Sequence, residues 1–260
     1  MKKNIIATAV AMVLVLPVTA DAAKVLGDEL EIYGKLHLSV DASDTDGLNA
    51  NKEDISISSN SSRLGFKGKH KIANGDMSVV YQLEQEVAIG DGKDGGSTLV
   101  TRNSFAGLKG SFGQVIVGYH DTPFKTVGSK WGVFGDSVGE RRAILGAGAL
   151  SGNKMNQRGK NALMWTRKIG NLKAMAMYSA DSSKTEGKID NNDNVMTSVG
   201  MLYKGKGIPF YFGAAYEDWD NLTSTIGATD GYRVMAGYKA GFGKIGFIYE
   251  DITSVVADMD

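Results

Sequence analysis

The feature that most restricts the fold of this chain is a repeated alternation of apolar and polar residues. Its first instance, LEIYGKLHLSV, runs from Leu30 to Val40, and Gly34 alone interrupts the apolar series. A period of two is typical of a β-strand whose two faces meet different surroundings. Those surroundings are either a protein core and water, or lipid and water.

The alternation returns in about eleven segments, each about nine to twelve residues long, which is the length that a tilted strand needs to cross a bilayer. Further instances are Met77–Val87, Val115–Tyr119, Leu163–Trp165, Leu172–Tyr178, Val195–Tyr203, Phe210–Tyr216, Tyr232–Tyr238 and Ile245–Tyr249. Beyond the N-terminal segment no run of about 18 apolar residues occurs, so we expect no membrane-spanning helix.

Long and short connections alternate between these segments. The short ones are KHKIANGD, KGSFG, KIGN, KGKGIP and KAGFG. The long ones are DASDTDGLNANKED, GDGKDGGST, a segment of about residues 122–157, DSSKTEGKIDNND and NLTSTIGATD. Tyr and Trp residues gather near the strand ends, as in the aromatic belts of membrane interfaces. Barrels of the bacterial outer membrane have short turns at one end and long loops at the other, so these patterns predict an all-β, transmembrane antiparallel β-barrel.

The composition excludes several other classes of protein. Lys+Arg 29 balance Asp+Glu 29, so no net field points to a nucleic-acid partner. The chain has Cys 0, which excludes a thiol nucleophile, a zinc–thiolate site and an iron–sulfur cluster. We therefore predict no cofactor, no metal site and no catalytic residues.

The N-terminus has the pattern of an export signal. Lys2 and Lys3 precede an apolar run, and Ala20-Asp21-Ala22 has the small residues of a cleavage site. We predict a cleaved signal peptide over residues 1–22 and a barrel domain over residues 23–260.

Four motifs resemble the general diffusion porins of Gram-negative outer membranes, on the branch of neutral to anion-preferring trimeric porins. They are EIYGKLHLSV, SSRLGFKGKHKIANGDMSVVYQLEQEV, RNSFAGLKGSFGQVIVGYHDTPF and QRGKNALMWTRK. The resemblance implies a barrel of sixteen strands, of which about eleven are present here, and a homotrimer in contact with outer-membrane lipid and lipopolysaccharide. It also implies passive diffusion of ions and small hydrophilic solutes.

The resemblance further implies that the third external loop, about residues 122–157, folds inward and narrows the pore. Its charged residues include Asp136, Glu140 and Arg141. Basic residues on the wall would face this loop, and by motif position they are Arg63, Arg102 and Arg158. Because Leu64 and Phe66 lie on the apolar face of their strand, Arg63 is expected on the opposite face, toward water. Basic wall residues would bias the pore toward anions.

Porins of this kind end on a terminal strand, usually with an aromatic residue, whereas this chain ends ITSVVADMD. We therefore expect a chain truncated at its C-terminus by about five strands, because unpaired strand edges in lipid are costly.

Two alternative functions remain. A secreted β-sandwich for binding or adhesion would also show alternating strands. An outer-membrane β-barrel enzyme would need a nucleophile and a base, but no serine or aspartate spacing around His37, His70 or His120 forms a recognisable site. The protein is therefore predicted not to be an enzyme.

Overall fold

A computed structural model describes residues 18–44, 53–72, 75–89, 99–130, 136, 145–146, 154–182, 194–205, 207, 209–220 and 226–256. The chain divides into two compact units. Unit 1 comprises Met1–Phe66 and Glu84–Thr101, and unit 2 comprises Lys67–Leu83 and Arg102–Asp260. Strands β5 (Arg63–Lys71) and β6 (Ser78–Val87) contribute residues to both.

Unit 1 is built from short antiparallel pairs. Its strands are β1 (Val18–Lys24), β2 (Glu31–Leu36), β3 (Leu38–Asp44), β4 (Glu53–Ser59) and β7 (Leu99–Thr101), together with the unit 1 ends of β5 and β6. Strand β1 pairs with β2, β3 with β4, and β7 with the end of β6.

The first predicted strand is divided in two at His37. The backbone N–H of His37 donates to Ser62 Oγ at 3.0 Å, and its carbonyl accepts from the N–H of Asn60 at 2.7 Å. Because these bonds replace a regular ladder, a single strand from Leu30 to Val40 was the wrong prediction. The long polar connection after it was also wrong at both ends, since β3 continues through Asp44 and β4 begins at Glu53.

Strand β1 runs through the predicted signal peptide. Its residues 18–22 belong to the segment that we expect to be cleaved, and Val18 pairs with Leu36 across to β2. Cleavage after residue 22 stays a prediction.

Unit 2 is a single antiparallel sheet in which each strand from β8 onward pairs with the next in the chain. The strands are β8 (Ser104–Gly110), β9 (Gly113–Asp121), β10 (Arg158–Ile169), β11 (Leu172–Ser179), β12 (Met196–Lys204), β13 (Phe210–Trp219), β14 (Ile226–Ala240) and β15 (Gly243–Val256). Strands β14 and β15, of 15 and 14 residues, are longer than the segments that the sequence predicts.

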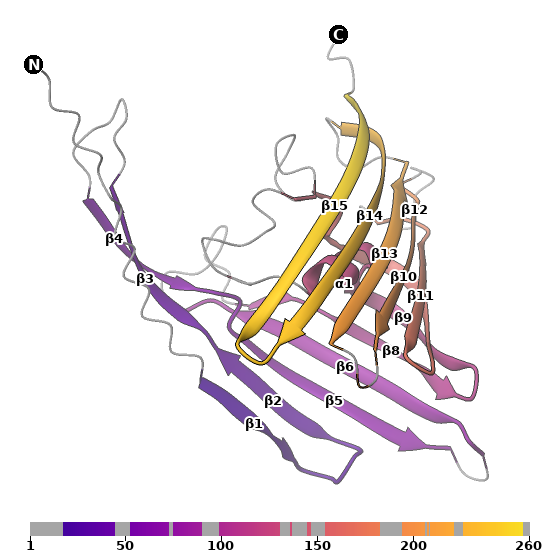
Figure 1. Cartoon of the computed structure of the whole chain (residues 1–260). Coiled ribbons are helices and arrows are strands. Elements are labelled where there is room, and N and C mark those ends of the chain that lie inside the picture. The colour runs from indigo at the N-terminus through magenta and orange to yellow at the C-terminus, as the bar shows by residue number, and fades with distance from the viewer. Residues whose placement is uncertain are drawn as a thin grey trace, which may run out of the picture. The chain divides into compact units, whose positions relative to one another are not determined.

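The predicted alternation of connections is confirmed in unit 2. Short turns join β8 to β9, β10 to β11, β12 to β13 and β14 to β15 at one end of the sheet, the lower side of Figure 1. The longer connections leave from the opposite end. Gly170, between β10 and β11, has a φ of 58°, a left-handed conformation that glycine adopts without strain.

One face of this sheet exposes its apolar residues. Along β12 to β15, Val199 is 44% exposed, Phe212 49%, Val234 43% and Phe247 65%. These residues share one parity of their strands, as the pairing of Phe212 with Ala236 and of Ala236 with Phe247 shows. A sandwich would bury such a face against a second sheet. Exposed apolar residues on one face are instead typical of the outward face of a transmembrane β-barrel.

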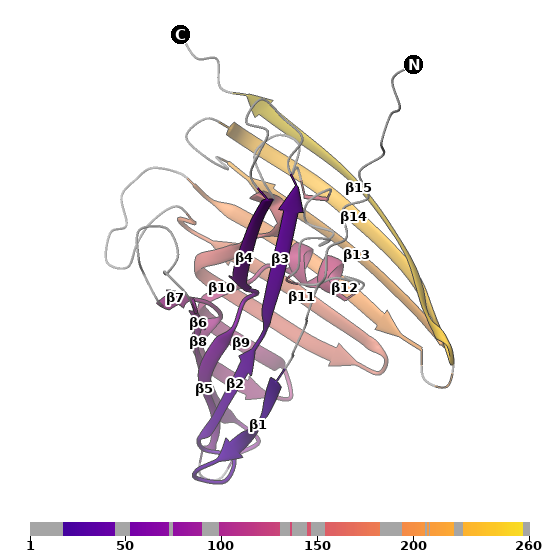
Figure 2. The same ribbon diagram turned by 90° about the vertical axis from the view of Figure 1, so that its left-hand side faces the viewer.

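The opposite face of unit 2 is covered by helix α1 (Pro123–Ser129) and a short 3-10 helix, η2 (Lys154–Asn156). Figures 1 and 2 show α1 on the inner side of the curved sheet. Between helix and wall lies a cluster rich in methionine, which comprises Phe124, Val127, Met155, Met164, Met175, Met177, Met196, Trp219 and Met235 with their neighbours. Among the described residues, no helix is long and apolar enough to cross a membrane.

Candidate functional site: the inner face of unit 2

Helix α1 begins the long connection that follows β9, and its own sequence explains where it starts. Thr122 is the N-cap, and its hydroxyl accepts from the backbone N–H of Lys125 at 3.1 Å. Pro123 follows at the first helical position, where a missing N–H costs nothing. Chain that leaves β9 therefore turns at once onto the inner face.

The first turn of α1 is attached to the wall by hydrogen bonds. The backbone N–H of Phe124 donates to Ser198 Oγ of β12 at 3.2 Å, and the carbonyl of Phe124 accepts from Arg233 Nη1 of β14 at 2.9 Å. The guanidinium of Arg233 also lies 4.0 Å from the centre of the Phe124 ring, a cation–π contact. The helix also approaches the wall closely, because a Cβ atom at Gly200 would lie 3.1 Å from Pro123 Cβ.

Arg233 is fully buried and binds the far end of the same connection. Its Nη2 lies 2.6 Å from Glu250 Oε2 on β15 and 3.0 Å from Asn156 Oδ1 in η2. Glu250 accepts a short hydrogen bond from the backbone N–H of Gly146. The Arg233–Glu250 pair therefore holds the connection at residues 124, 146 and 156. A buried guanidinium that binds three oxygen acceptors rigidly fixes its neighbours.

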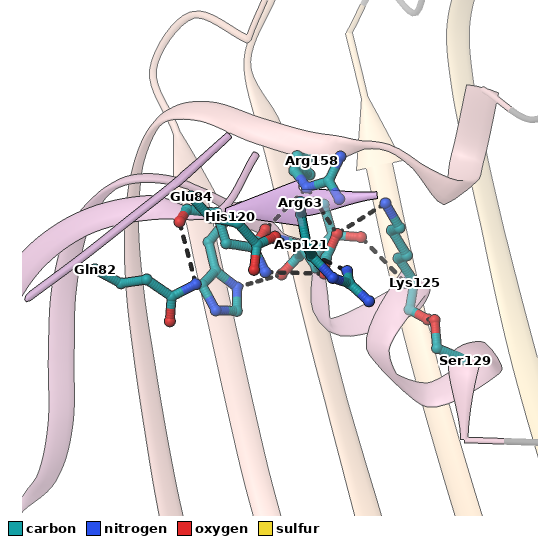
Figure 3. Close-up of polar contacts among 10 residues, drawn as sticks. Arg63, Gln82, Glu84, His120, Asp121, Lys125, Ser129 and Arg158 are labelled. Carbon is teal, nitrogen blue, oxygen red and sulfur yellow. Dashed lines mark hydrogen bonds and ion pairs between the residues drawn. The ribbon is translucent and has the colours of Figure 1, made fainter. Parts of the chain in front are cut away.

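A second charged cluster lies where β9 meets α1 (Figure 3). Asp121 Oδ1 lies 2.8 Å from Lys125 Nζ and 3.1 Å from Arg158 Nε, while its Oδ2 accepts from Asn103 Nδ2 at 3.0 Å. Arg158 Nε also donates to Asn103 Oδ1 at 2.9 Å. Asp121 thus offsets part of the positive charge of Lys125 and Arg158.

Glu217 is a fully buried carboxylate on the inner face. Its Oε1 accepts from Trp219 Nε1 at 2.9 Å on the same strand, β13. Buried carboxylates need such donors, because loss of hydration is costly.

The predicted site residues belong to different units of the chain, and some lie outside the described residues. Arg63 belongs to unit 1, where its Nη1 lies 4.0 Å from Glu84 Oε1. Arg102 and Arg158 belong to unit 2, and Arg102 is 8% exposed. Asp136 is described, with a φ of 61°. Glu140 and Arg141 lie outside the described residues, as does most of the predicted constriction loop.

Sequence reasoning missed Arg233, Glu217, Glu250 and Lys125. A signal for the first three was present, since each directly follows a tyrosine of the apolar series (Tyr232, Tyr216 and Tyr249) and so has the parity of the polar face. Their pairing was not readable, because it depends on the register that sets Arg233 opposite Glu250.

In the described parts of the chain, no group of three or more His, Cys, Asp or Glu residues is arranged to hold a metal ion.

Comparison with known proteins identifies relatives of the whole chain. The family described as "Gram-negative porin" matches residues 7–259. A stretch of 130 residues is 34% identical to the major outer membrane protein P.IB of Neisseria sicca and covers 48% of this chain but 33% of that protein. The protein of the same name from Neisseria meningitidis serogroup A is 25% identical over 247 residues, or 92% of this chain and 67% of its own length.

A solved structure shows the same fold. The anion-selective porin from Comamonas acidovorans superposes with a TM-score of 0.70 at 18% identity, over 88% of this chain and 69% of that one.

Proposed function

The chain belongs to the Gram-negative porin family, and we propose that it forms a water-filled channel across the outer membrane. The channel passes ions and small hydrophilic solutes by passive diffusion. Such a function needs no catalytic residue and no cofactor. The proposal includes export with removal of residues 1–22, insertion into lipid and lipopolysaccharide, and assembly as a homotrimer.

One observation supports the channel above all. In unit 2 the exposed face is apolar, with Phe247 at 65% and Phe212 at 49%, whereas the inner face holds Arg233 and Glu217 at 0%. A soluble protein distributes these residues the other way round. In a bilayer, a wall of this kind places hydrocarbon outside and water within.

The connection at about residues 122–157 would act as the constriction. Attachment of α1 to the inner face of β12 and β14 supports this role, because the helix occupies space that would otherwise be lumen. Asp136, Glu140 and Arg141 would add loop charges, and Arg63, Arg102 and Arg158 would supply wall charges. Charges at the narrowest section bias which ions enter.

Planar-bilayer recording tests the channel itself. The purified protein, inserted into a bilayer in 1 M KCl, is expected to give discrete conductance steps that scale with salt concentration. Absence of steps from protein that migrates as a folded, heat-modifiable species would contradict the proposal.

Ion preference is tested by reversal potentials across a salt gradient. Replacement of Arg63, Arg102 and Arg158 together by Gln is expected to lower the permeability ratio of chloride to potassium. Asp121→Asn is the opposite control, because it releases Arg158 and Lys125 from their carboxylate partner and should raise that ratio. An unchanged ratio in both variants would remove these residues from the selectivity mechanism.

A further inference from the structure

Lysines gather at the turn end of unit 2. They stand at or next to the strand ends that the short turns join. The set that we call the turn-end lysines consists of Lys109, Lys168, Lys173, Lys204, Lys239 and Lys244. All of them are exposed, and strand β5 adds Lys67, Lys69 and Lys71. Among the described residues of unit 2, Asp76 is the one carboxylate that belongs to a turn at this end.

Strand parity places the turn-end lysines on the inner face. Lys173 shares its parity on β11 with Met175 and Met177, which are 2% and 3% exposed beneath the inner helix. On β14, Lys239 likewise shares its parity with Arg233 and Met235. Six residues separate Arg233 from Lys239, which is about 20 Å along an extended strand. These lysines therefore line the inner wall. Lys239 lies well away from Arg233, which holds α1, whereas Lys173 lies close enough to Lys130, the C-cap of α1, for their charges to interact.

Two of the lysine pairs are directly opposed across the sheet. Lys168 pairs with Lys173 between β10 and β11, and Lys239 pairs with Lys244 between β14 and β15. Like charges that face each other in this way destabilise a sheet. The repeated arrangement therefore does not serve the stability of the fold.

The charges nearer the helix are arranged differently. Arg158 lies 3.1 Å from Asp121, and Arg233 lies 2.6 Å from Glu250. Each carboxylate offsets the positive charge of its partner, so these arginines contribute less to the potential in the lumen than their number suggests. Positive potential on the inner face of unit 2 should be greatest along the turn-end lysines.

We propose that the turn-end lysines form an anion-collecting mouth that binds multivalent oxyanions and makes the larger contribution to the ion preference of the channel. This inference rests on the proposed channel function. An ammonium group is a mobile point charge with three donors, and two opposed ammonium groups can bind one polyanion together. Rows of like charge also focus the potential within a narrow lumen with low-dielectric walls.

The test uses single-channel recording with tripolyphosphate added to one compartment at a time. Block is expected from one side only, at low salt, and should vanish near 1 M salt, where the screening length is about 3 Å. In the variant K168Q/K173Q/K239Q/K244Q, the half-blocking concentration should rise about tenfold, which corresponds to a loss of about 1.4 kcal/mol of binding free energy.

A matched pair of single variants distinguishes the effect of a charge that faces the lumen from the effect of the total charge of the protein. Lys168→Gln and Arg167→Gln each remove one positive charge from the same turn, but position 167 shares the outward parity of Leu163 and Trp165. We expect Lys168→Gln to weaken the block and Arg167→Gln to leave it unchanged.

The outcomes distinguish the two proposals. If no variant conducts, including the unmodified protein, the channel function itself fails. If the channel conducts but the fourfold variant keeps its block and its chloride preference, the anion-collecting mouth is wrong. If block is lost only in the variant with Gln at positions 63, 102 and 158, the oxyanion site lies at the constriction and the inference is overturned.

Discussion

The inner face of unit 2 divides into two halves, one with a pair of opposite charges across neighbouring strands and one with pairs of like charges. In the half covered by α1, the buried Arg233 and the partly buried Glu250 face each other across neighbouring strands. In the half beside the short turns, Lys239 and Lys244 are exposed and face each other across the same two strands. One register thus sets opposite charges together at one end and like charges at the other.

We interpret the Arg233–Glu250 pair as serving the structure, and the Lys239–Lys244 pair as serving the proposed function. Charged groups that lose their hydration need other hydrogen-bond partners. Here Arg233 and Glu250 obtain them from each other and from the connection at residues 124, 146 and 156. Exposed like charges cost little in water but create a field. In the proposed channel, the same strand pair would hold the constriction at one end and attract anions at the other.

Loss of the Arg233–Glu250 pair should have the largest effect on the free energy of unfolding. Arg233→Met leaves the partly buried Glu250 without its cationic partner and removes the hydrogen bonds to Phe124 and Asn156. We expect the free energy of unfolding to fall by about 3–5 kcal/mol and single-channel conductance to rise as α1 is released. Urea titration of protein folded into lipid vesicles measures the first, and bilayer recording measures the second.

The matched control is Lys173→Met in the exposed half, which relieves a contact with Lys168 and should leave the free energy of unfolding within about 0.5 kcal/mol. Equal losses in both variants would show that the two halves do not differ.

A charge on the outward face should have the next largest effect. Val234→Lys places an ammonium on the exposed apolar face, one residue from Arg233 but on the opposite side of the wall. At mid-bilayer depth such a change costs about 2–4 kcal/mol of folding free energy. Urea titration of the variant folded into lipid vesicles measures this loss. A tolerated lysine at position 234 would mean that this face does not meet hydrocarbon.

Reversal of one turn-end charge should have the smallest effect on stability. Lys168→Glu converts the pair with Lys173 into opposite charges and should stabilise the sheet by about 0.2–1 kcal/mol. The same variant should lower the chloride preference measured by reversal potential. A loss of stability would show that Lys168 is held by partners other than Lys173.

The fold was largely readable from the sequence because alternation reports directly on the two faces of a strand. Leu163, Phe212 and Val234 stand where that pattern places them, on the exposed side. The short turns were readable for the same reason. The division at His37 was not, because it depends on hydrogen bonds to Asn60 and Ser62 from another part of the chain.

The site was less predictable than the fold. Motif resemblance singles out Arg158, and the structure places it beside Asp121. Resemblance gave no reason to choose Arg233, whose importance comes from its contacts with residues 124 and 156. Those contacts depend on where α1 and η2 lie, and local sequence preference does not determine the docking of a helix on a wall.

The order of the strands in unit 2 has a consequence for how the wall assembles. Each strand from β8 to β15 finds its partner next along the chain, so no pairing has to close more than one connection. The short turns carry the smallest entropic penalty, and the penalty of the longer connections grows only slowly with their length. Growth can proceed one hairpin at a time, with the last strand as template for its successor. In the proposed channel, a slip of one residue would turn Arg233 to the apolar outward face, so the observed register is strongly favoured over its neighbours.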